Sequence, residues 1–123
     1  MLRSFLLVGL GGFFGSMARY GTSFLVGKVV TGSFPVGTFI INLLGCLLIG
    51  FLYGLAVRSQ WLQTGGMLLL ASGFCGGYTT FSTFALENIV LMQKQQYFVP
   101  LLYILLSVIA GLILCRVGIW LAR

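Results

Sequence analysis

The residues of this chain that could do chemistry are polar side chains set within apolar sequence, and the densest group lies between residues 73 and 84. Polar side chains cost free energy in hydrocarbon, so this group is a functional candidate by default. The glycines Gly76 and Gly77, followed by the β-branched Thr79 and Thr80, make a poor helix interior. We predict a helix break at the glycines, which would free backbone carbonyls able to coordinate a cation. The alternative is a continuous helix whose hydroxyls bond carbonyls one turn earlier.

Two aromatic rings follow in the same segment. Phe81 and Phe84 are three residues apart and therefore share a helix face, with Ser82 and Thr83 along its edge. The edge of a phenyl ring carries partial positive charge, so rings presented edge-on can attract an anion. Phe is also common in membrane helices, and packing alone would explain the pair.

Two further segments each carry a polar stripe. Thr38 and Asn42 lie one helical turn apart, and so do Tyr103 and Ser107. Each pair could simply join two helices by hydrogen bonds. Polar stripes from three segments together favour an ion-conducting track over three separate packing contacts.

Arg19 and Glu87 are charged residues that fall inside apolar segments. We expect a structural role for Arg19, whose side chain either reaches the membrane interface or bonds unpaired carbonyls of a neighbouring helix. Glu87 is the only acid in the chain. We expect it to meet an Arg or to face a vestibule, and it is the one candidate for proton coupling.

The overall composition excludes a free-standing soluble domain. Of 123 residues, 59% are hydrophobic and only 7% are charged, against roughly 25% charged in soluble domains. With one acid and no His, paired-carboxylate, Ser-His-Asp and the usual zinc chemistries each lack parts. We therefore predict that the chain is not an enzyme. The cations are scattered singly, which is typical of membrane-edge anchors and not of a nucleic-acid-binding face.

Four apolar stretches organise the chain. A hydrocarbon core of about 30 Å needs about 20 mainly apolar helical residues, and we expect spans over about 4–27, 34–57, 63–92 and 97–121. They form a single domain, 1–123, of an all-α, multi-pass protein of the cell (inner or plasma) membrane. The first stretch also resembles a secretory signal peptide, but three more spans follow it, so we expect it to be retained.

The interfacial charges give a weak orientation signal. Arg3, Arg58, Arg116 and Arg123 fall on one side of the membrane, and Lys28 and Lys94 on the other. This is four against two, but Arg116 lies about a turn and a half inside the last helix, and without it the count is three against two. Insertion in both orientations is therefore an alternative to a single topology. A four-helix chain of this size also encloses little interior, so we expect a pathway through it to need a second subunit.

Three segments, in order along the chain, carry a family resemblance. Residues 11–20 (GGFFGSMARY), 42–45 (NLLG) and 73–84 (GFCGGYTTFSTF) together resemble the Fluc (CrcB) family of fluoride channels. The stretch from Gly76 to Phe84 is the most specific part of the match.

The resemblance implies a dual-topology homodimer, in which two antiparallel copies form two pores. It implies a structural Na⁺ ion at the dimer interface, held by the backbone carbonyls of Gly76 and Thr79 where the third helix is broken. Phe81 and Phe84 would present ring edges to fluoride. Other anion-pathway positions that match the family are Thr38, Asn42, Ser82, Thr83, Tyr103 and Ser107, and Glu87 also has a counterpart.

The implied function is passive export of cytoplasmic fluoride, with the lipid bilayer, fluoride and a second copy as the partners. The main alternative is a small multidrug-type exporter that couples protons to a cationic substrate. Such a carrier should place its essential acid in the first helix, where this chain has Arg19 and no acid. A membrane scaffold without a pathway would not explain polar stripes on three segments.

Overall fold

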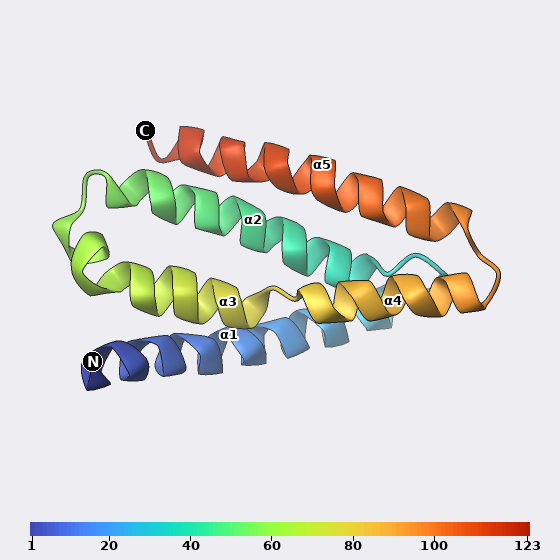
Figure 1. Cartoon of the computed structure of the whole chain (residues 1–123), viewed down its shortest axis with the longest axis horizontal. Coiled ribbons are helices and arrows are strands. Elements are labelled where there is room, and N and C mark those ends of the chain that lie inside the picture. The colour runs from blue at the N-terminus through green and yellow to red at the C-terminus, as the bar shows by residue number, and fades with distance from the viewer.

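The computed structural model describes residues 1–123, and the chain is entirely helical. The helices lie side by side, and both termini are at the same end of the bundle (Figure 1). The elements are α1 (Leu2–Val29), α2 (Val36–Ala56), η1 (Leu62–Gly66), η2 (Leu68–Cys75), α3 (Gly76–Tyr78), α4 (Phe81–Gln93) and α5 (Phe98–Leu121). The prediction of an all-α chain is confirmed.

The third helical segment is broken, but not at the residues that the sequence suggested. Gly76 and Gly77 lie within α3, and the extended residues are Thr79 (φ −80°, ψ 159°) and Thr80 (φ −150°, ψ 121°). The predicted position, at the glycine pair, is therefore wrong by about three residues. Gly77 serves a different purpose, because a Cβ atom there would lie 2.6 Å from the carbonyl oxygen of Gly12. The glycine permits close packing of α1, and the threonines form the break (Figure 1).

The helix before the break is wound more widely than an α-helix. Both η1 and η2 are π-helical. Such turns are rare and occur often at functional sites. No periodicity in the sequence distinguishes a π-helix from an α-helix here, so the π-helical turns were not predicted.

Glycine contacts join the helices in two pairs. Gly11 and Gly15 place bare backbone of α1 against the backbone of η2 and α3, and Gly50 and Gly118 do the same between α2 and α5. At each position a Cβ atom would overlap backbone atoms of the partner helix. Small residues let helices approach in this way where apolar burial alone does not drive association. The gap between the two pairs is where the site described below lies.

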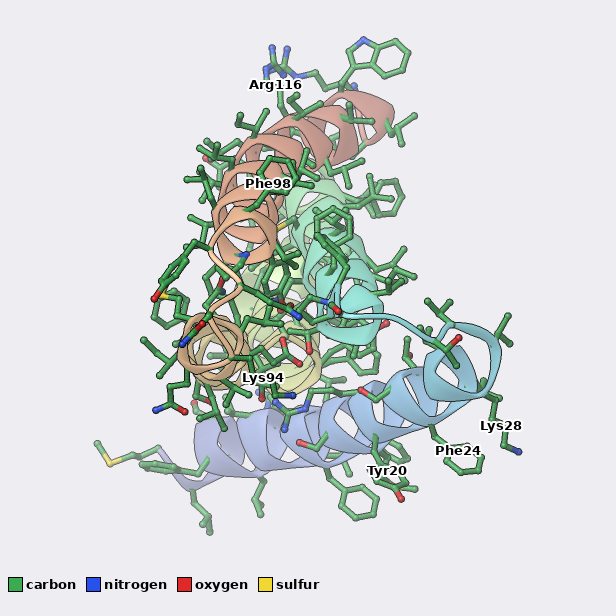
Figure 2. The ribbon with its side chains drawn as sticks, turned by 90° about the vertical axis from the view of Figure 1, so that its right-hand side faces the viewer. Tyr20, Phe24, Lys28, Lys94, Phe98 and Arg116 are labelled. Atoms are coloured by element: carbon green, nitrogen blue, oxygen red, sulfur yellow. The ribbon has the colours of Figure 1, made fainter.

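The outer surface is strongly apolar. Large hydrophobic side chains of α1 and α5 point outward, and only 23 of 123 residues are buried, so lipid or another chain must cover this surface. Tyr20, Phe24 and Lys28 of α1 and Arg116 of α5 point away from the bundle (Figure 2). By length and composition, α2 and α5 could each cross a membrane.

Candidate ion pathway

One side chain of α2 holds the break in place. Asn42 donates from Nδ2 to the carbonyl oxygen of Thr80 (3.0 Å), and its Oδ1 accepts the Thr80 N–H (2.9 Å). Thr80 is buried, and an unpaired backbone group there would cost about 1–3 kcal/mol. Asn42 therefore stabilises the extended backbone, a role that its predicted place in an anion track did not include.

Thr80 is the N-cap of α4. Its Oγ1 accepts the N–H of Thr83 (3.2 Å) and donates to the Oγ1 of Thr83 (3.0 Å). A Thr that accepts the N–H three residues later is a strong helix start. Thr80 was expected from the sequence only to break the helix, although its position before the apolar helix 81–93 was a signal for this cap.

These contacts leave two carbonyls without their helical partners. In a continuous helix the Thr80 N–H would bond the carbonyl of Gly76. The Thr83 N–H would likewise bond the carbonyl of Thr79. Side-chain oxygens accept both N–H groups instead. The carbonyls of Gly76 and Thr79 can thus accept donors or ions from outside the helix.

Arg19 of α1 lies against the break. Its Nη1 donates to the carbonyl oxygen of Thr79 (3.4 Å). Of the two positions expected for this side chain, the structure has the bond to a carbonyl of a neighbouring helix. Arg19 also lines a cleft of about 270 Å³ together with Ser16, Tyr20, Ser23, Thr38, Ile41, Thr80 and Thr83. A cleft that contains a cation and the hydroxyl-bearing residues Ser16 and Ser23 favours an anion.

An open groove of about 440 Å³ lies beside the break, between α2 and the third segment. We call it the break groove. Of the residues selected from the sequence, it is lined by Asn42, Gly76, Thr79, Phe81, Phe84 and Ser107. The Oγ atom of Ser107 is buried and has no hydrogen-bond partner in the chain. The groove therefore combines apolar walls with a few polar atoms that can bind a ligand.

The two phenyl rings share one face of α4, as their spacing predicts. Their centroids are 5.8 Å apart, and the ring planes are inclined by 38°. The ring of Phe84 also packs in a T-shaped arrangement against Tyr103, with centroids 4.8 Å apart. Phe81 is 80% exposed. Phe84 is thus anchored by its own chain, and Phe81 is available to contact another.

Glu87 accepts two hydroxyl hydrogen bonds. Thr38 Oγ1 donates to Oε1 (2.7 Å), and the Tyr103 hydroxyl donates to Oε2 (2.9 Å). Tyr103 is completely buried. The expectation that Glu87 meets an Arg is wrong, because Arg19 turns toward the break instead. Glu87 and Thr38 also line a small cleft of about 220 Å³, which leaves the alternative of a vestibule position.

The predicted stripes therefore divide into two groups. Asn42 and Ser107 line the break groove, whereas Thr38 and Tyr103, one turn away on the same helices, bind Glu87. Ser82 and Thr83 are exposed at the start of α4.

Tyr103→Phe should lower the free energy of unfolding by about 1.5–3 kcal/mol, because the carboxylate of Glu87 loses one of its two donors. Chemical denaturation of the purified protein measures this loss. Tyr97→Phe, which changes an exposed Tyr, is the matched control and should be neutral. Equal stability of the two variants would show that the Glu87 contact carries little energy.

Comparison with known proteins places the whole chain in one group. The model of the family described as "CrcB-like protein, Camphor Resistance (CrcB)" matches residues 6–119. A "Fluoride-specific ion channel FluC" of Azobacteroides pseudotrichonymphae is 45% identical over 111 residues, which cover 90% of this chain and 89% of that protein. Proteins with the same name match over 98% and 99% of this chain: one of Chlorobium phaeobacteroides (42% identical, 92% of its length) and one of Flavobacterium psychrophilum (40% identical, 98%).

Proposed function

The chain belongs to the CrcB-like family, and on this premise we propose that it is a fluoride channel of the cell membrane that lets cytoplasmic fluoride leave passively. It is an all-helical membrane protein and not an enzyme. The observation that carries the function is identity of 40–45% over nearly the whole chain to proteins named fluoride-specific ion channels. The multidrug-type alternative has no such support, and α1 contains no acid.

The break groove supplies the chemistry that fluoride needs. The ion is small and strongly hydrated, so a pore must replace its water without holding it too tightly to leave. The spare amide hydrogen of Asn42 and the hydroxyl of Ser107 provide donors. The ring edges of Phe81 and Phe84 provide weak positive potential. We assign these four side chains to the anion pathway, and the cleft around Arg19 to its approach.

A second copy in antiparallel orientation would close the break groove. One chain leaves the groove open and leaves Phe81 exposed, so the pathway is incomplete in a monomer. The charges support insertion in both orientations. Arg3, Arg58 and Arg123 belong to the segments at the end that holds the termini, whereas Lys28, in the last turn of α1, and Lys94, just after α4, belong to segments at the other end (Figure 1). Three cations against two give little orientation bias.

Lys94→Cys should be labelled from both sides of the membrane by a thiol reagent that cannot cross it. Lys94 is exposed in the connection between α4 and α5, so about half of the molecules should react from each face. Arg58→Cys, at the opposite end of the bundle, should give the same result. Labelling of either variant from one face only would reject dual topology.

The freed carbonyls of the break suit a structural Na⁺ ion shared by two copies. Neutral carbonyl oxygens are the hard ligands that such a cation prefers, and the chain has no cluster of acidic, Cys or His ligands. Gly76 is exposed, and a Cβ atom there would meet nothing within 4 Å, so its backbone is open to a partner. The carbonyls of Gly76 and Thr79 from both copies would hold the ion. When bound, it would supply positive charge that draws these oxygens together.

Removal of Na⁺ should therefore destabilise the assembly. Purified protein transferred from Na⁺ to an equal concentration of N-methylglucamine should melt at a lower temperature, because a ligand at about 100 times its Kd contributes about 2.7 kcal/mol. A high-resolution map should show a buried ion with several oxygen ligands at the two-fold axis. Identical melting in the two salts, with no density at the axis, would reject the site.

Export through such a pore needs no energy source. Hydrogen fluoride crosses lipid as a neutral acid and ionises in a less acidic cytoplasm, which traps fluoride. With the interior negative, outward movement of one anion gains about 2.3 kcal/mol per 100 mV. Passive export therefore requires no proton coupling by Glu87, whose carboxylate is bonded to Thr38 and Tyr103.

Growth on fluoride tests the function in cells. A bacterial strain that lacks its own fluoride exporter should grow in fluoride when it produces this chain, and should fail when it produces an equal amount of Phe84→Ile. If the strain that produces this chain instead grows in toxic organic cations and fails to grow in fluoride, the multidrug-type alternative is favoured.

A further inference from the structure

A second groove lies on the opposite face of α2 from the break groove. The α2 residues of the break groove are Asn42, Gly45, Cys46 and Ile49. Those of the second groove are each two positions further along: Leu44, Leu47, Leu48 and Phe51. Two residues turn an α-helix by roughly 200°. A second copy seated in the break groove would therefore leave the second groove facing outward.

This groove is apolar and has no unmet hydrogen bond. It measures about 540 Å³, and Ala18, Thr22, Phe74, Tyr78 and Leu121 complete its lining. The ring of Tyr78 stacks on Phe74 with centroids 5.9 Å apart, and its hydroxyl shares a hydrogen bond with Thr22 (3.2 Å). We call it the Tyr78 groove. Its surface suits a hydrocarbon chain.

At one end of the Tyr78 groove, Phe51 and Leu121 come from the C-terminal parts of α2 and α5, and these helices end where both termini of the chain lie (Figure 1). Arg58, two residues beyond α2, and Arg123, two residues beyond Leu121, are both exposed there. The only acid of the chain, Glu87, is bonded elsewhere. This end therefore presents uncompensated positive charge, which attracts an anionic headgroup.

We propose that the Tyr78 groove binds one acyl chain of an anionic phospholipid whose phosphate lies at Arg58 and Arg123. The length agrees with this occupant. From Leu44 to Phe51 the α2 lining of the groove rises about 10 Å, which lies within the depth of about 15 Å of one leaflet of hydrocarbon. A lipid with an apolar acyl chain and an anionic headgroup matches both the apolar lining of the groove and the positive charge of Arg58 and Arg123.

The bound chain would also support the break. Tyr78 is the last helical residue before Thr79, and its ring forms part of the groove. Tyr78 is already buried by its own chain, and a lipid chain in the groove would cover the small part of this ring that remains exposed. The inference is independent of fluoride conduction, because lipid binding is measured without flux.

Native mass spectrometry of the full chain tests the proposal, with phosphatidylglycerol and phosphatidylcholine of identical acyl chains as probes. The wild type should retain phosphatidylglycerol in preference. Leu44→Trp fills the groove, and displacement of two methylenes lowers affinity about tenfold. Leu105→Trp, a similarly exposed Leu on α5 outside the groove, should retain the lipid.

The headgroup contact is tested separately. Arg58→Gln should reduce the preference for phosphatidylglycerol about fivefold, whereas Arg116→Gln, whose side chain points away from the bundle on α5 (Figure 2), should not. Equal retention of both lipids by the wild type would overturn the proposal, and so would unchanged retention by Leu44→Trp. If Leu44→Trp instead converts dimers to monomers, the groove binds a second copy and the lipid assignment is wrong.

Discussion

Phe81→Ile and Phe84→Ile should each reduce fluoride flux roughly tenfold or more, while a folded assembly remains. Ile keeps the bulk and apolarity of the position but removes the ring quadrupole, whose contacts are worth about 0.5–1.5 kcal/mol each, and about 1.4 kcal/mol corresponds to a factor of ten in rate. The rings lie 5.8 Å apart beside the break groove, so one anion can contact both edges. Fluoride efflux from liposomes measures the effect.

The two variants differ in their expected cost to folding. Phe81 is 80% exposed in one chain, so its replacement should leave the chain's stability nearly unchanged. Phe84 loses its contact with Tyr103 and should be somewhat less stable. Phe5→Ile, which changes an exposed Phe of α1 outside the groove, is the matched control. Wild-type flux through both correctly assembled groove variants would show that the rings only pack.

Asn42→Leu should abolish most activity and lower the free energy of unfolding by about 2–4 kcal/mol. Leu is close in size but cannot bond the Thr80 backbone, so a buried N–H and a buried carbonyl lose their partners. The extended backbone at Thr80 then loses its support, so the break groove and the Gly76 carbonyl, a proposed cation ligand, are no longer held in place. Thermal unfolding in Na⁺ and fluoride efflux measure the two effects.

The stability measurement separates two roles of Asn42. If the residue only donates to fluoride, Asn42→Leu should lose flux at an unchanged melting temperature. If it holds the break, both should fall. Asn88→Leu removes a buried amide that bonds only the carbonyl of Phe84, and provides the control for loss of a buried polar group away from the groove. Wild-type melting of Asn42→Leu would contradict the role described for the break.

Residue types alone predicted the helical class, the existence of a break and the shared face of Phe81 and Phe84. These features follow from local chemistry, such as β-branching and the three-residue spacing. The position of the break does not follow from local chemistry, because it depends on contacts between residues that are distant in the sequence. Gly77 stays helical against Gly12 of α1, and the amide of Asn42 captures Thr80 across 38 positions of sequence.

The sequence also could not predict which polar residues bond Glu87 and which lie at the break. Thr38 and Asn42 share a stripe on one helix, yet the first bonds Glu87 and the second bonds the break. Helical periodicity predicts which residues share one face of a helix. It does not predict which residue of another helix contacts each turn of that face. The π-helical winding of residues 62–66 and 68–75 shifts those neighbours further.

Efflux of fluoride and chloride from liposomes that contain only this protein tests the central claim most directly. With valinomycin to balance charge and no pH gradient, liposomes loaded with fluoride should empty rapidly, and liposomes loaded with chloride should retain the ion. Both outcomes are expected of a passive, fluoride-selective pore. Retention of fluoride without a proton gradient, or equal release of chloride, would contradict the account.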